Sequence, residues 1–239
     1  MAALGHVLAD LDAAHADVAP AGSLDTALDA SRSLLDTMSP AEVVAAAASL
    51  LDWEGALAGV GPRRERCRLI SYAAIMHGAT LLPLLPPLLR TLVPCFDEEE
   101  PLVAEELLRT VGNLARYALV APLPGPLPAD VLITLVRPLL AGAADACAPS
   151  VRRCACCRAT ARVLMEAPRE QLQLPAAALP VLHGVLKMLA AHPEGEPRDP
   201  FLTRDALLPV GRLLQLLGAG LPEVDAHFVT QCALGWGWG

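Results

Sequence analysis

The feature of this sequence that most limits its fold is a pattern that recurs from Leu81 onward. Each unit has an apolar segment flanked by proline, then a polar turn, then a second segment with an apolar stripe. Self-similarity of this kind is typical of chains that stack one helix pair on the next. The three units are residues 81–118 with the turn 97–100, residues 127–167 with the turn 145–148, and residues 174–220 with the turn 193–197.

A shift of 48 residues aligns the first two units, placing Pro101 on Pro149 and Val103 on Val151. Three further positions of each unit then coincide: Leu108, Val111 and Ala115 with Cys156, Ala159 and Val163. Residues spaced by three and four share one face of a helix, so these positions predict one buried face in both units. The third unit departs from the pattern, because its turn is longer and Pro209 lies within its second segment.

This pattern resembles HEAT and armadillo repeats, in which an acidic or polar turn precedes a second helix that starts with Pro-x-Val or Val-Arg. The resemblance covers residues 63–220 and implies an all-α fold, a superhelical stack of antiparallel helix pairs. An irregular helical domain without repeats is the alternative. The residues that match the repeat motif are Asp97, Pro101, Val103, Leu107, Leu108, Asp145, Pro149, Val151 and Arg152.

Composition also favours helices. The chain is 54% hydrophobic but only 3% aromatic, and Ala and Leu far outnumber Val and Ile. Small and unbranched side chains suit closely packed helices, whereas strands are rich in β-branched and aromatic residues. An all-β fold is therefore not expected.

The N-terminal and C-terminal segments, and the link into the repeats, are predicted separately. Residues 1–62 are expected to form two or three helices as a cap or degenerate repeat, with starts at Ser23 and at Ser39-Pro40. Gly59 to Pro62 is expected to stop a helix, and the arginine-rich residues 63–68 to link it to the next one. Residues 221–239 form a tail whose Trp236 and Trp238, set among glycines, indicate a truncated repeat array more than an aromatic anchor for a partner.

Charge and cysteine content limit the possible partners of the protein and the compartment in which it is expected. The net charge of −8 disfavours nucleic acid, whose phosphates require a basic face. The N-terminus lacks the basic and apolar regions of a secretory signal, so a cytoplasmic location is expected. Seven cysteines make an odd number without the spacing of a disulfide scaffold, which favours reduced thiols.

A membrane-associated helical protein is one alternative, because several apolar stretches are long. The best candidate, Leu69 to Val93, contains His77, Arg90 and three prolines, and no stretch is an uninterrupted span of about 20 apolar residues. Helices buried by their neighbours explain this hydrophobicity better, so membrane insertion is not expected.

A second alternative is a metal- or redox-responsive protein that uses Cys147, Cys154, Cys156 and Cys157. Cys154 and Cys157 lie one helical turn apart and could share a zinc ion. No second Cys or His pair follows at finger-like spacing, and the βαβ setting of a redox CxxC is missing. Small thiols packed in a helical core are the favoured interpretation, with no metal or cofactor.

The segment with these cysteines also carries the candidate partner surface: Arg152, Arg153, Arg158 and Arg162. Arg158 and Arg162, four residues apart, share a helix face. They are expected either to bind an acidic partner peptide or to pair with acidic side chains of an adjacent unit.

No motif in the sequence indicates a catalytic site. The six histidines are scattered without an HExxH pair, and there is no phosphate-binding loop, dinucleotide fingerprint or nucleophile elbow. No small-molecule substrate is inferred. The predicted function is a non-catalytic scaffold or adaptor that binds a protein or peptide along a helical-repeat surface.

Overall fold

The computed structural model describes residues 2–15, 20, 22–52, 59–120, 128–172, 175–190, 199–217, 227 and 230. All regular elements in these ranges are helical, so the predicted all-α class is confirmed. The elements are α1 (Ala2–Ala14), α2 (Ser23–Thr37), α3 (Pro40–Leu50), α4 (Val60–His77), η1 (Gly78–Leu84), α5 (Leu85–Leu92), η2 (Val93–Asp97), α6 (Pro101–Val120), α7 (Val131–Ala144), α8 (Ser150–Glu166), α9 (Arg169–Leu172), α10 (Pro175–Ala190) and α11 (Pro200–Leu217).

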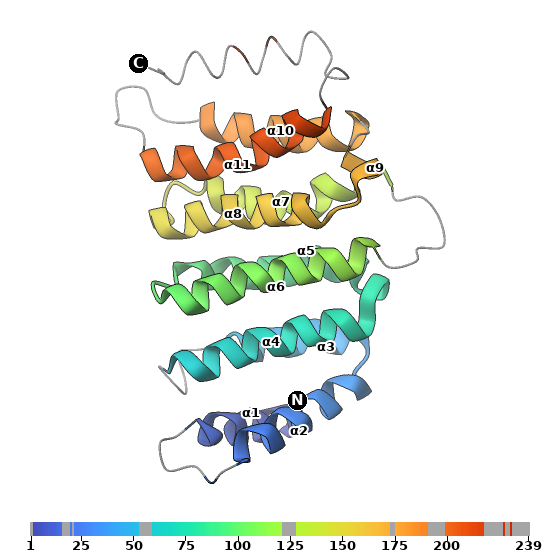
Figure 1. Ribbon diagram of the computed structural model, residues 1–239, viewed down its shortest axis with the longest axis vertical. Helices are drawn as coiled ribbons and strands as arrows, with labels where there is room; N and C mark the ends of the chain where they lie inside the picture. Colours follow the sequence, from blue (N-terminus) through green and yellow to red (C-terminus); the bar gives the residue numbers. More distant parts are fainter. Residues whose placement is uncertain are drawn as a thin grey trace.

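The helices lie in layers along the long axis of the molecule, from α1 and α2 at one end to α10 and α11 at the other (Figure 1). Each layer pairs a first helix with a second. Contacts between layers form two rows, a first-helix row of α1, α3, α5, α7 and α10 and a second-helix row of α2, α4, α6, α8 and α11. One continuous hydrophobic core extends through all layers.

The predicted helix starts in the N-terminal region are confirmed. Helix α2 begins at Ser23, and Ser39 caps α3. The Ser39 hydroxyl accepts from the Glu42 backbone N–H at 3.4 Å, and the Glu42 carboxylate accepts from the Ser39 N–H at 2.8 Å. This reciprocal capping box satisfies two backbone donors that a helix N-terminus otherwise leaves unpaired.

The alignment of the second helices is one residue away from the predicted shift. A shift of 48 would pair the fully buried Val103 with Val151, which is 43% exposed. A shift of 49 instead puts Leu107 on Cys156 and Leu114 on Val163, and all four side chains are buried. The apolar spacing in α6 and α8 fits both shifts over part of its length, and only the packing distinguishes them.

The arginine-rich segment is not a link, because α4 begins at Val60 and contains it. All four of its arginines form ion pairs with carboxylates outside the segment. Arg63 binds Glu98 and Arg66 binds Asp12 of α1. Arg64 and Arg68 both approach Glu106 Oε2 of α6, at 3.9 and 3.3 Å. The segment therefore joins layers, and the predicted boundary at residue 62 lies inside a helix. Of the predicted tail, only residues 227 and 230 belong to the described part.

By length and composition alone, one stretch of the described chain, Val60–Asp97, could cross a membrane. It is not a single straight helix here. It consists of α4, η1, α5 and η2, and these elements pack against α3, α6, α7 and α8.

Candidate interaction surface

Three of the four candidate arginines join α8 to other elements, and two of these lie at its start. Arg152, near the start of α8, binds Asp97 of η2 through both carboxylate oxygens, with Nε 2.6 Å from Oδ1. Hydrogen bonding to Asp97 raises the pKa of the Arg152 guanidinium. Arg153 Nε donates to the Ala143 carbonyl at 3.0 Å, at the C-terminal end of α7. These side chains therefore hold α8 against its neighbours.

The other two lie further along α8. Arg158, which is 40% exposed, has its Nε 3.2 Å from Oδ2 of the buried Asp205 of α11. Arg162 is exposed and has no ion pair or hydrogen bond with any described residue. Arg152 and Arg158 thus bind carboxylates of neighbouring layers, Arg153 binds the other helix of its own layer, and Arg162 is the exposed one of the four.

Arginines also recur across the layers. Arg68, Arg109 and Arg158 occupy one position on α4, α6 and α8, and the shift of 49 superimposes Arg109 on Arg158. Arg68 and Arg109 both approach the buried Glu106, at 3.3 and 3.5 Å from Oε2. In this part of the row the charges balance, because Arg64, Arg68 and Arg109 lie among Glu65, Glu105 and Glu106.

On α8 and α11, basic residues outnumber acidic ones. We define the basic face as Arg158, Arg162, Arg204 and Arg212. Asp205 is the only acidic residue of α11, and it binds both Arg158 and Arg204, at 3.2 and 2.9 Å. The single acidic residue of α8, Glu166, binds Arg116 of α6. Positive charge on this face therefore exceeds negative charge among the described residues.

Large apolar side chains are exposed on the same two helices. Met165 of α8 is 50% exposed, and Phe201 and Leu208 of α11 are 62% and 50% exposed. Phe201 and Leu208 lie one turn on either side of Arg204, and the Arg204 guanidinium is 5.7 Å from the Phe201 ring centroid. The face thus combines cationic and apolar groups.

Sequence reasoning missed Arg204 and Arg212 because it treated the basic strip as a feature of one helix. A signal was present, since a shift of 50 residues places Arg162 on Arg212 and Ala155 on Asp205. Once α8 and α11 are known to lie side by side, this shift predicts a surface that crosses two helices.

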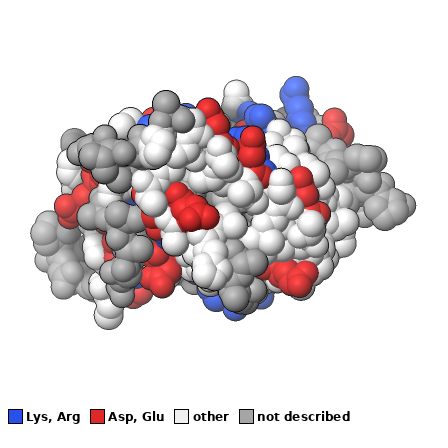
Figure 2. All heavy atoms as spheres, turned by 90° about the horizontal axis from the view of Figure 1, so that it is seen from below, with Lys and Arg blue, Asp and Glu red and all other residues white. Residues whose placement is uncertain are grey.

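The opposite end of the molecule is acidic. Helices α1 and α2 expose Asp10, Asp25, Asp29 and Asp36, against one arginine, Arg32. Figure 2, which views the molecule from this end, shows separate acidic clusters with basic groups mainly at the margins. The net charge of the chain therefore hides a strong asymmetry along the stack.

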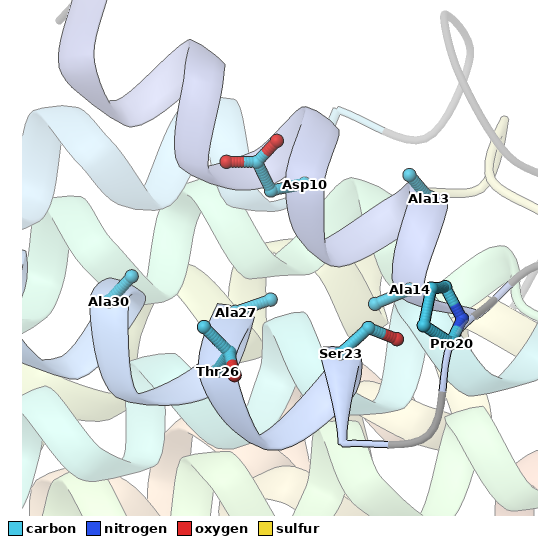
Figure 3. A pocket seen from close by; sticks show the side chains of 8 residues that line it. All are labelled: Asp10, Ala13, Ala14, Pro20, Ser23, Thr26, Ala27 and Ala30. Carbon is cyan, nitrogen blue, oxygen red and sulfur yellow. The ribbon is translucent and has the colours of Figure 1, made fainter.

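A recess of about 360 Å³ lies between α1 and α2. Figure 3 shows that short side chains line it, with Asp10 on one helix and Ser23 and Thr26 on the other. The Thr26 hydroxyl donates to the Gly22 carbonyl at 3.1 Å. The described lining residues thus supply one carboxylate beside two hydroxyls, and these groups alone form no arrangement for acid–base or nucleophilic catalysis.

No protein-family model matches this sequence, and a search of curated proteins finds no similar one. A crystal structure of an engineered protein from the Northeast Structural Genomics Consortium aligns with a TM-score of 0.39 and 14% identity, over 96% of this chain and 51% of that chain. The chain thus spans about half the length of that protein. These comparisons assign no family.

The cysteines of α8 are packed inside the protein. Cys154, Cys156 and Cys157 are buried, and a Cβ atom on Gly142 of α7 would lie 2.7 Å from Cys156 Sγ. Burial raises the pKa of Cys154 and Cys157, and it raises the pKa of Cys156 to about 12. Zinc binds thiolates, so protonated thiols are poor ligands. Among the described residues, no group of three or more Cys, His, Asp or Glu could hold a metal ion.

We expect iodoacetamide at neutral pH to modify Cys147 at least tenfold faster than the three buried cysteines, because exposure and thiolate character control thiol reactivity. Cys147 is the exposed cysteine of this group. Peptide mass spectrometry of the native protein over time would give the four rates. Equal rates at Cys147 and Cys157 would mean that α8 does not pack as described.

Proposed function

We propose that this chain is a non-catalytic scaffold whose layers form a HEAT- or armadillo-like α-solenoid that binds another protein along its second-helix row. The observation that carries the proposal is the basic face on α8 and α11, where arginines outnumber carboxylates and exposed apolar side chains lie between them. Stacked repeats offer extended surfaces suited to such binding.

The chemistry of the basic face favours a partner segment that alternates acidic and apolar residues. Guanidinium groups bind carboxylates in a planar, bidentate manner, and Arg and aromatic residues are frequent anchors of protein interfaces. The exposed Arg162 has no partner in the described part of the chain, so an incoming carboxylate displaces no existing contact there. The protein is proposed to act in the cytoplasm, without a cofactor.

The test uses a variant that removes charge without exposing a buried carboxylate. Arg162→Glu with Arg204→Gln changes the charge by −3 and leaves Arg158 to bind Asp205. A control with the same charge change, Arg32→Glu with Lys187→Gln, alters exposed residues of α2 and α10, away from the basic face. Both variants should retain the helical circular dichroism of the parent chain.

The probe is a library of 15-residue peptides selected on the immobilised full chain. We expect the selected peptides to combine Asp or Glu with Leu or Phe. The basic-face variant should bind them at least tenfold more weakly, a loss of about 1.4 kcal/mol, while the control binds as the parent does. Equal binding by both variants would exclude the basic face, and no selection by the folded chain would contradict the scaffold function.

A further inference from the structure

A second recess, of about 320 Å³, lies between α5 and α7 in the first-helix row. Pro86 and Arg90 of α5 line it, together with Thr134, Arg137, Pro138 and Ala141 of α7. It belongs to the opposite row of helices from the basic face. The short proline and alanine side chains leave the hollow open, and the two arginines are the charged groups among the described residues that line it.

The two arginines occupy equivalent positions in neighbouring layers. A shift of 47 residues superimposes Arg90 on Arg137 and brings four buried pairs into register: Leu85 with Leu132, Leu88 with Leu135, Leu89 with Val136, and Leu92 with Leu139. Packed helices lie about 8 to 10 Å apart. Two arginine side chains at that separation, lining one hollow, can direct their guanidinium groups at a single ligand.

Neither guanidinium has a partner within the part of the chain that the structure describes. Arg90 and Arg137 are exposed and form no ion pair or hydrogen bond with the described residues, whereas Arg63, Arg66, Arg68, Arg109, Arg116, Arg152, Arg158 and Arg204 all bind carboxylates. No acidic residue occurs in α5 or α7, and Asp130 and Asp145 flank the ends of α7.

The helices packed on either side add little negative charge. Helix α10, beyond α7, carries Lys187 and His183 and no acidic residue. Helix α3, beside α5, carries one acidic residue, Glu42, which is held in the capping box with Ser39. The recess is therefore a locally positive site on an acidic chain, and such a site concentrates anions near it.

From this geometry we infer that the recess between α5 and α7 binds a phosphoryl group, with Arg90 and Arg137 as its ligands. Two guanidinium groups match the charge of a phosphate dianion and can each donate paired hydrogen bonds to its oxygens. The Thr134 hydroxyl, in the same lining, supplies a further donor. The group comes either from free phosphate or from a phosphorylated side chain of a protein.

The experiment titrates the full ¹⁵N-labelled chain, in chloride buffer of constant ionic strength, with inorganic phosphate and, separately, with acetate. The arginine Nε–H resonances are followed by NMR. We expect phosphate to shift the Arg90 and Arg137 signals saturably, and acetate to shift them at least tenfold less at equal concentration. Saturation by acetate at the same concentration would overturn the phosphoryl assignment.

Arg90→Gln with Arg137→Gln should abolish the saturable shift of the remaining recess resonances, including the Thr134 amide. Arg32→Gln with Arg169→Gln, which makes the same charge change outside the recess, should leave it intact. The single variant Arg137→Gln serves if the double variant does not fold, and it should weaken binding at least tenfold. Binding that survives loss of both arginines would overturn the inference.

A phosphoserine peptide and its unphosphorylated form distinguish the sources. Phosphopeptide binding at least tenfold tighter than phosphate, and lost without the phosphate, identifies a phosphorylated protein segment. Equal affinity of phosphate and phosphopeptide identifies the free ion. Binding of both peptides alike, unaffected by the arginine variants, would place the contact elsewhere and contradict the proposed site. Because this recess lies apart from the basic face, its failure leaves the scaffold proposal unaffected.

Discussion

Replacing Arg66 by alanine is expected to lower the free energy of unfolding by about 3 to 5 kcal/mol, because it leaves the buried Asp12 without its partner. Arg66 and Asp12 are only 5% and 6% exposed, and Arg66 Nη1 also donates to the Asp52 carbonyl at 3.1 Å. Urea denaturation followed by circular dichroism would measure the loss.

Two further variants test whether the unpaired charge of Asp12 causes the loss of stability in Arg66→Ala. Arg32→Ala removes an exposed pair with Asp29 and should cost less than about 1 kcal/mol. Replacing both buried partners, by Asp12→Leu with Arg66→Met, should recover most of the stability lost in Arg66→Ala, because no charge then remains buried. A double variant as unstable as Arg66→Ala would show that the guanidinium stabilises α1 by packing and not through its charge.

The second large effect is expected at Leu107. This side chain is fully buried in α6, so Leu107→Ala should lower the free energy of unfolding by about 2 to 5 kcal/mol. Leu108 is only partly buried against the core, so Leu108→Ala should cost clearly less, about 1 kcal/mol. The same urea titrations give both values. The opposite order would support the alignment by 48 residues.

The sequence predicted the helical class and several helix starts because these depend on local chemistry. Ser39, Pro40 and Glu42 specify a helix start without help from distant residues, and their capping box is present. The burial of Val111 and Ala115 was also predicted, since apolar spacing indicates a face.

The burial and pairing of charged side chains could not be predicted from the sequence, because they depend on contacts between layers. Arg66 follows Glu65 in a charged run that resembles a solvated helix start, and only the position of Asp12, 54 residues away, makes it a buried side chain. Arg158 and Arg204 meet through Asp205 for the same reason. Charge patterns along one helix cannot show which neighbouring helix will face them.

The two rows differ in how continuous their helices are. In the first-helix row, α5 has eight residues between 3-10 elements, and Pro138 and Pro180 interrupt the backbone hydrogen bonding of α7 and α10. In the other row, α4, α6 and α8 have no proline beyond their first turn, whereas α11 contains Pro209. Proline inside a helix removes a backbone hydrogen bond and permits a kink.

The middle layers therefore have a compliant side, formed by α5 and α7, and a stiff side, formed by α4, α6 and α8. When the stack flexes, the bending strain falls mainly on α5, α7 and α10, where the backbone already lacks hydrogen bonds. The spacing between α6 and α8 changes least. A partner lying across α4, α6 and α8 meets side chains at a nearly constant spacing. A ligand between α5 and α7 lies where flexing changes the separation of the two helices. Its binding and the curvature of the stack are therefore mechanically coupled.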